Sequence, residues 1–233
     1  MSSAAANLLH FLLHVFDELK YGFPIPIPIK NPPAIVLTFV SDAAGRPDPG
    51  KPLAYDIGVG SVGTLSPYPH ILYVGQALWP QEFLLRLDIL DKFFGRKTTL
   101  LETLGLILPL FHNRDFIRGR HVVLMVDNLA TVWAYAKGRS KSDKYTSIIL
   151  TALTTVTSAL NCKLYVQHCP RLSSKPAVLA DLLSRTNQKG LDIVKKHNDQ
   201  IRFGWPPSLD RWLRSPSLDW SLGSSLLKDF LRD

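Results

Sequence analysis

The chain has 233 residues, of which 46% are hydrophobic and 20% are charged. This is an ordinary globular composition, which excludes a disordered protein and allows one substantial domain with extensions. The 27 Lys and Arg residues outnumber the 19 Asp and Glu residues, and the resulting net charge of +8 favours a polyanionic partner such as a nucleic acid.

Residues 1–33 are predicted to form an N-terminal helix followed by a proline-rich connector. The apolar run at 8–16 is short and lacks both a basic leader and a small-residue cleavage site, so neither a signal peptide nor a membrane span is expected. Proline alternates with isoleucine over 24–29, a pattern that neither a helix nor a central strand tolerates. We therefore expect a folded domain to begin near Ala34, after an extended connector.

Strands and helices alternate over residues 34–186 in a pattern typical of one α/β domain. Strands are predicted at 35–41, 53–59 and 71–74, and their short links favour an antiparallel meander. The elements predicted next are a helix with Glu102, a strand at 122–126, a helical region to about Leu160, a strand at 163–167 and a helix with Asp181. This order predicts a mixed sheet with helices on its faces.

Residues 187–233 form a C-terminal extension rich in proline and tryptophan. It is too apolar for a free linker and too often interrupted by proline for one helix, so we expect it to pack on the domain or on a neighbour. Two cysteines, Cys162 and Cys169, match neither a zinc quartet nor a disulfide framework. Cysteine usage therefore favours an intracellular compartment, and cytoplasm and nucleus both stay open.

Four acidic residues from separate segments are the strongest chemical signal. Asp42 and Asp127 end apolar runs that are predicted strands, whereas Glu102 and Asp181 lie in helical patterns. A single Asp after a strand is more often a turn former or a helix cap. Four acids brought together would repel one another unless divalent cations neutralised them, and hard oxygen ligands favour magnesium or manganese. Two-metal phosphodiester hydrolysis is the chemistry that suits such a cluster.

The order and surroundings of these acids resemble the ribonuclease H domain of retroelement reverse transcriptases, of the long-terminal-repeat and DIRS types. Ser41-Asp42-Ala43 resembles the first-strand motif of that family, and the string 180–185 (Ala-Asp-Leu-Leu-Ser-Arg) is similar to its closing motif. Asp127-Asn128 followed by the string 137–140 resembles the fourth strand and its sequel, and 168–171 resembles the segment before the closing motif. The resemblance covers about residues 34–186.

This resemblance implies a ribonuclease H-like fold that hydrolyses the RNA strand of an RNA·DNA hybrid with two Mg²⁺ or Mn²⁺ ions. Asp42 would bridge both metals, Glu102 and Asp127 would bind one, and Asp181 would help to hold the other. No other cofactor is expected. The chain departs from the family through insertions near 44–52 and 76–97, and it shows no polymerase palm motif. A polymerase domain or partner chain could contact the N-terminal helix and the C-terminal tail, whereas no membrane partner is expected.

Basic residues with interleaved aromatic residues flank the Asp127 strand. The usual explanation for a charge run is a solvated face, but Trp133, Tyr135 and Tyr145 make contacts with sugar and backbone plausible. The residues predicted to bind nucleic acid are Asn128, Lys137, Arg139, Ser140, Lys141 and Arg171.

Two further signals have simpler explanations. The string Gly-Val-Gly-Ser-Val-Gly at 58–63 matches a dinucleotide-binding pattern, but Pro67 and Pro69 stand where the required helix should begin. A glycine-rich second strand that passes close to another backbone explains it better. His168 could act as a proton shuttle near the metals, but its position at a strand end favours a structural role.

Two other functions stay open on the sequence alone. One is a non-catalytic nucleic-acid-binding or scaffolding domain of the same fold. The second is a DNA-cutting nuclease similar to integrases or resolvases. Four carboxylates argue against the first, because a binding domain gains nothing from mutual repulsion.

Overall fold

The computed structural model describes residues 36–45, 57–66, 68–90, 96–140, 143–171, 173–185, 192, 195, 201–215 and 221–231. The predicted N-terminal helix and connector lie outside these residues, so those predictions stay untested. Within the described part of the chain, no helix is long and apolar enough to cross a membrane.

A six-stranded sheet forms the centre of the domain, in the order β5-β4-β1-β2-β3-β6. The strands are β1 Val36–Ala43, β2 Gly58–Ser66, β3 Tyr68–Leu78, β4 His121–Val126, β5 Lys163–His168 and β6 Ile201–Phe203. The predicted antiparallel meander is confirmed, because β1 pairs with β2 and β2 with β3 in antiparallel register. β4 lies parallel to β1 and β5 parallel to β4, so the sheet is mixed.

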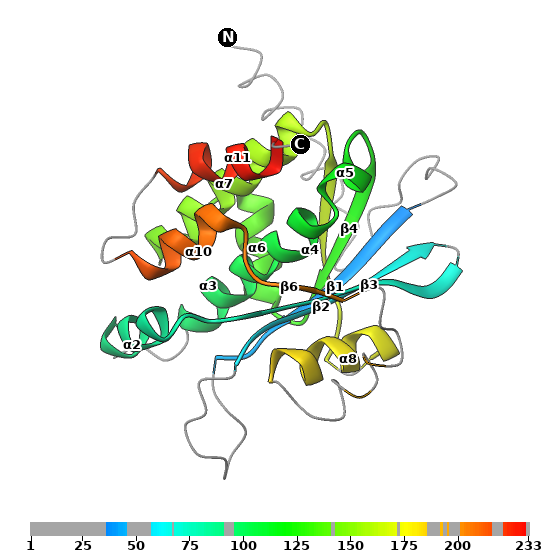
Figure 1. Ribbon diagram of the computed structural model, residues 1–233, viewed down its shortest axis with the longest axis horizontal. Coiled ribbons are helices and arrows are strands. Elements are labelled where there is room, and N and C mark those ends of the chain that lie inside the picture. The colour runs from blue at the N-terminus through cyan, green and yellow to red at the C-terminus, as the bar shows by residue number, and fades with distance from the viewer. Residues whose placement is uncertain are drawn as a thin grey trace, which may run out of the picture. The chain divides into compact units, whose positions relative to one another are not determined.

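Helices cover both faces of this sheet (Figure 1). They are α2 Gln81–Leu90, α3 Arg96–Gly105, α4 Ile107–His112, α5 Arg114–Ile117, α6 Leu129–Lys137, α7 Lys144–Ala159, α8 Lys175–Ser184, α10 Pro207–Arg214 and α11 Leu222–Leu231. Of the described helices, α8 lies on one face, and α3, α4, α6 and α7 lie on the other, with α10 and α11 outside them (Figure 1). The predicted α/β fold class, a mixed sheet flanked by helices, is confirmed.

Two apolar cores follow from the two-residue period of the strands. Leu37 and Phe39 of β1 belong to the larger core under α3, α4 and α7, whereas Val40 belongs to the smaller core under α8. Because β1 is buried on both faces, its sequence is a nearly continuous apolar run, which is why it was recognisable as a strand.

Close approaches between neighbouring backbones explain the glycines of β2. A Cβ atom added at Gly58 would lie 2.0 Å from the carbonyl oxygen of Ala77 in β3, and one added at Gly60 would lie 2.2 Å from that of Ala180 in α8. Real Cβ atoms do not approach this closely, so both positions require glycine. The structure therefore confirms a glycine-rich strand and gives no support to a phosphate-binding loop.

The C-terminal residues that the structure describes pack on the domain. The strand β6 adds to the sheet beside β3, and α11 packs on α7. Trp205 stacks on Trp79 with 4.9 Å between ring centroids, and its indole N–H donates to the carbonyl of Leu78 at 2.7 Å. His112 in α4 accepts a hydrogen bond from Tyr73 at 2.8 Å and donates to the carbonyl of Gly204 at 3.0 Å.

The element boundaries differ from the prediction in the second and third strands and at the insertion near 76–97. The second strand covers 58–66, whereas 53–59 was predicted, of which 53–56 lie outside the described residues; the glycines that weaken a sequence-based strand assignment lie inside the observed strand. The third strand covers 68–78 rather than 71–74. The expected insertion at 76–97 begins within β3 and continues as α2, a helix that the sequence did not predict.

Candidate metal centre

Asp42 and Asp127 lie at the carboxyl ends of two adjacent parallel strands. Val40 of β1 pairs with Met125 of β4 in parallel register. Asp42 and Asp127 each come two residues later, so they lie level with each other. Asp42 is buried, with 7% of its surface exposed, and Asp127 is partly exposed. The carboxyl ends of adjacent parallel strands direct side chains from different strands into one crevice.

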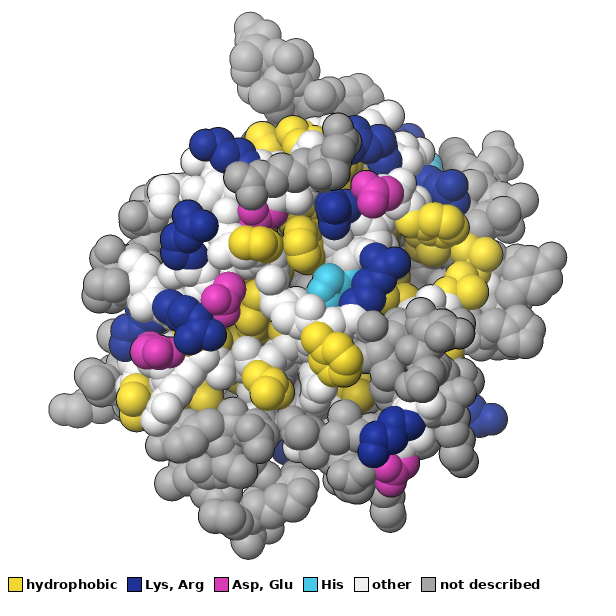
Figure 2. Space-filling view, viewed as in Figure 1, with side chains coloured by type: hydrophobic (Ala, Val, Ile, Leu, Met, Phe, Trp, Pro, Cys, Tyr) yellow, Lys and Arg dark blue, Asp and Glu magenta, His cyan; other side chains and the backbone are white. Residues whose placement is uncertain are grey.

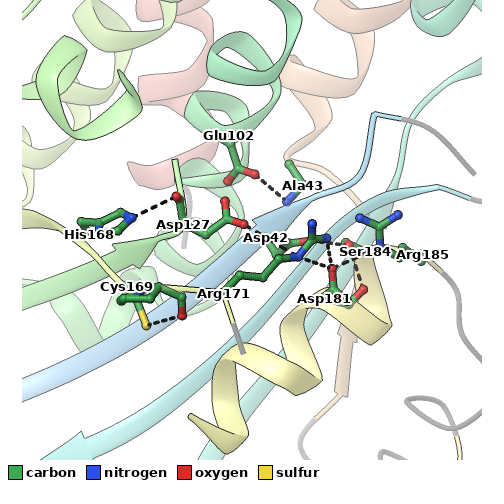
Figure 3. Close-up of polar contacts among 11 residues, drawn as sticks. Asp42, Ala43, Glu102, Asp127, His168, Cys169, Arg171, Asp181, Ser184 and Arg185 are labelled. Atoms are coloured by element: carbon green, nitrogen blue, oxygen red, sulfur yellow. Dashed lines mark hydrogen bonds and ion pairs between the residues drawn. The ribbon is translucent and has the colours of Figure 1, made fainter. Parts of the chain in front are cut away.

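Glu102 reaches the same point from α3. Its Oε1 atom accepts a hydrogen bond from the backbone N–H of Ala43 at 3.2 Å, which fixes the carboxylate beside the end of β1. The helix α3 approaches β1 closely at Gly105, where an added Cβ atom would lie 3.0 Å from the Ser41 hydroxyl oxygen, and that hydroxyl donates to the Gly105 carbonyl at 3.0 Å. One oxygen from each of Asp42, Glu102 and Asp127 lies within 4.8 Å of the other two. Figure 3 shows these side chains pointing toward one another.

Burial and nearby acids disfavour the charged forms of Asp42 and Glu102. Burial raises the pKa of Glu102 well above its ordinary value, and the nearby Asp42 and Asp127 raise it further. Burial also raises the pKa of Asp42, although a hydrogen bond from Ser184 opposes this shift. Asp42 and Glu102 can therefore both be ionised at low cost only beside a strong countercharge.

The donor set fits a divalent cation. The Oε2 atom of Glu102 is buried without a hydrogen-bond partner, although buried carboxylate oxygens are nearly always satisfied. A hard cation held between Asp42, Glu102 and Asp127 would provide that partner, since carboxylate oxygens are the ligands that magnesium and manganese prefer. The arrangement is thus able to bind a metal ion, and the three predicted ligands come together.

Asp181 in α8 lies beside this group but is engaged differently. Its Oδ1 atom accepts hydrogen bonds from Arg171 and, at 3.1 Å, from Nε of Arg185. Burial alone would raise the pKa of Asp181, but the hydrogen bonds from the two guanidinium groups outweigh it and leave the pKa below its ordinary value. Nε of Arg171 also lies 3.9 Å from Oδ2 of Asp127, so the guanidinium lies between these two acids (Figure 3).

Comparisons with known proteins give matches to solved structures. No protein-family model matches the chain, and no curated protein is significantly similar to it. A solved structure of LC11-RNase H1, isolated from compost by a metagenomic approach, aligns with a TM-score of 0.37 and 16% sequence identity, covering 69% of this chain and 97% of that chain. At this similarity the match assigns no activity, and the description of the fold depends on the sheet and helices themselves.

The residues predicted to contact nucleic acid occupy varied environments. The side chain of Asn128 caps α6 by accepting from the N–H groups of Ala130 and Thr131. Lys137 is exposed and lies 5.5 Å from the ring centre of Trp133, and Arg139 is exposed in the turn after α6. Ser140 exchanges hydrogen bonds with Ser147, Arg171 lies in the acidic group, and Lys141 falls outside the described residues.

His168 lies at the edge of the acidic group. It ends β5 with an exposed ring, and its Nε2 atom is 3.1 Å from the backbone carbonyl of Asp127, which can accept a hydrogen bond from it. This contact can support the loop that carries Asp127, in agreement with the structural role favoured by the sequence.

Ser184 is the residue that the sequence analysis did not single out. It was noticed only as part of the closing motif, yet its hydroxyl donates to Oδ2 of Asp42 at 2.5 Å. No local pattern could have indicated this contact, because the two residues are 142 positions apart.

Proposed function

We propose that the chain hydrolyses the RNA strand of RNA·DNA hybrids as a metal-dependent ribonuclease H, within a retroelement reverse transcriptase. The observation that carries this proposal is the meeting of Asp42, Glu102 and Asp127 at the carboxyl end of the sheet, with one oxygen of Glu102 buried and unpartnered. A domain that only binds nucleic acid would gain nothing from burying repelling acids in this way.

In this proposal, Asp42, Glu102 and Asp127, with help from Asp181, would hold two Mg²⁺ or Mn²⁺ ions. When bound, the cations lower the pKa of a water molecule and neutralise charge on the phosphate. The backbone N–H of Ala43 orients Glu102, and Ser184 orients Asp42. Arg171 is exposed beside Asp127 and Asp181, where its guanidinium can also pair with a phosphate of the substrate.

The remaining surface agrees with a substrate held mainly through its backbone. The chain carries a net charge of +8, and Figure 2 shows Lys and Arg side chains dispersed over the visible face among hydrophobic and acidic ones. Lys137, Arg139 and Lys144 cluster around the turn between α6 and α7, where Lys137 and Lys144 lie over aromatic rings. Such contacts recognise phosphate and sugar rather than base sequence.

The experiment that tests the proposal is a cleavage assay of the full chain on labelled RNA·DNA hybrid, double-stranded DNA and double-stranded RNA. We expect the hybrid to be cut with Mg²⁺ or Mn²⁺, and calcium, whose looser shell fits paired octahedral sites poorly, to be inactive. Cutting of DNA alone would indicate a nuclease of the integrase or resolvase kind. Binding of the hybrid without cleavage would indicate a non-catalytic domain.

A further inference from the structure

The helix α8 makes direct backbone contact with the sheet beneath the end of β1. Gly60 in β2 pairs with Asp42 in β1, and a Cβ atom added at Gly60 would lie 2.2 Å from the Ala180 carbonyl oxygen and 2.8 Å from the Ser184 backbone nitrogen. The missing side chain at Gly60 therefore lets the last turn of α8 approach the strand that carries Asp42.

This approach places the Ser184 hydroxyl against the Asp42 carboxylate. Ser184 is fully buried, and its Oγ atom lies 2.5 Å from Oδ2 of Asp42, a length typical of a hydrogen bond to an ionised acceptor. The same Oγ atom lies 2.9 Å from the backbone carbonyl of Asp181. A hydroxyl has one proton, and the carboxylate is the stronger acceptor, so the proton points to Asp42.

We propose that Ser184 is a positioning residue that holds the Asp42 carboxylate in the orientation required to bind metal. The inference deepens the proposed function, on which it rests. The Asp42 carboxylate is buried at the end of β1 and accepts a hydrogen bond from the Ser184 hydroxyl. The hydrogen bond occupies one carboxylate oxygen and so fixes the direction of the other toward Glu102 and Asp127. Partners of this kind are typically worth ten- to a hundredfold in metal affinity.

Binding of Mn²⁺ to the full chain, followed by electron paramagnetic resonance, tests this role without requiring activity. We expect Ser184→Ala to weaken Mn²⁺ binding by about ten- to a hundredfold. The matched control is Ser61→Ala, because the Ser61 hydroxyl is also fully buried, lies on the strand next to Asp42 and makes no hydrogen bond. This control should bind Mn²⁺ like the wild type.

A second variant separates positioning from packing. Ser184→Cys keeps a side chain of similar size with a weaker donor, so its Mn²⁺ affinity should fall between those of the wild type and Ser184→Ala. If Ser184→Ala does not fold, the comparison of Ser184→Cys with the wild type decides the question.

Equal Mn²⁺ affinity in the wild type and the folded Ser184 variants would overturn the positioning role while leaving the proposed function intact. Weakened binding in the Ser184 variants, in a chain that does not cleave the hybrid, would support the positioning role and overturn the nuclease proposal. Absence of Mn²⁺ binding in the wild type would overturn both.

Discussion

Glu102 combines deep burial with a carboxylate that has only one of its oxygens hydrogen-bonded. Burial, Asp42 and Asp127 raise its pKa well above the ordinary value of 4.5. Without metal, the folded state therefore retains a proton that the unfolded state releases as the pH rises above 4.5. Because the folded state binds more protons, this residue lowers the stability of the fold progressively above that pH.

We accordingly predict that Glu102→Gln becomes more stable than the wild type as the pH rises, when both are measured with a chelator present. The glutamine keeps the shape but does not ionise, so the difference should be small at or below pH 4.5 and grow above it. Urea unfolding at a series of pH values gives the measurement. A stability difference that does not vary with pH would contradict the shifted pKa.

The second residue-level prediction concerns Asp127. Asp127→Asn should reduce hybrid cleavage by at least about a thousandfold, since removing a charged metal ligand costs several kcal/mol of transition-state stabilisation. The fold should persist, and the thermal midpoint of the metal-free protein should not fall, because one repelling charge is gone. Asp115→Asn, at an exposed position of α5, is the control and should cleave normally.

The sequence indicated the site residues unevenly. Asp42 and Asp127 were predictable because each ends an apolar run, which marks the end of a buried strand. Glu102 has no such local signal, and its place depended on the family resemblance. The pairing of Asp181 with Arg171 and Arg185 and the contact of Ser184 with Asp42 were not predictable, because tertiary packing alone determines them.

At the scale of elements, the turn between α6 and α7 carries the prediction on nucleic-acid binding. Changing Lys137, Arg139 and Lys141 to alanine should weaken hybrid binding whatever the base sequence. The salt dependence of the affinity should also flatten, by about 0.9 in the log–log slope for each phosphate that the variant no longer neutralises. Replacement of Arg211 and Lys228, exposed on α10 and α11, is the control. An unchanged slope in the triple variant would show that this turn is only a solvated face.

The C-terminal extension is predicted to be integral to stability. Trp205 is buried in the main core and stacks on Trp79, whose indole N–H donates to the carbonyl of Ala44, two residues after Asp42. Trp205→Ala should therefore cost about 3–5 kcal/mol in the free energy of unfolding, measured in urea.

Phe203→Ala in the same extension is the matched control, because 66% of Phe203 is exposed and its loss should change stability by less than about 0.5 kcal/mol. Equal effects of the two substitutions would show that the extension contributes little to the core.

The elements were predictable where hydrophobic period and burial agreed. β1, β4 and β5 were found within two residues of their ends, since each is a short apolar run. The predicted position of β2 was wrong because its glycines lower the strand propensity. These glycines allow close backbone contact with β3 and α8, which is a tertiary requirement that local propensity does not encode. The sequence does not predict α2, because its residues lie within the segment 76–97 that departs from the family pattern as an insertion.

For the whole molecule, the proposal implies recognition of sugar chemistry without reading of bases. A hybrid presents 2′-hydroxyl groups on one strand in a wide, shallow minor groove, whereas base-specific readout needs an element in the major groove. Cleavage should therefore require several consecutive ribonucleotides opposite DNA and should vary little with their sequence. Chimeric substrates with increasing numbers of ribonucleotides test this, and cutting at one fixed base sequence would contradict it.

The central claim is that the acids at the end of the sheet form a metal-dependent centre for cutting RNA in hybrids. Its most direct test is cleavage of a labelled RNA·DNA hybrid by the wild type and by Asp127→Asn, in Mg²⁺, in Mn²⁺ and in chelator, beside an all-DNA duplex of the same sequence. We predict cleavage of the RNA strand by the wild type with either metal, and none in chelator, in the variant or on the DNA duplex. Cleavage of the DNA duplex with no activity on the hybrid, or equal rates in the wild type and the variant, would contradict the claim.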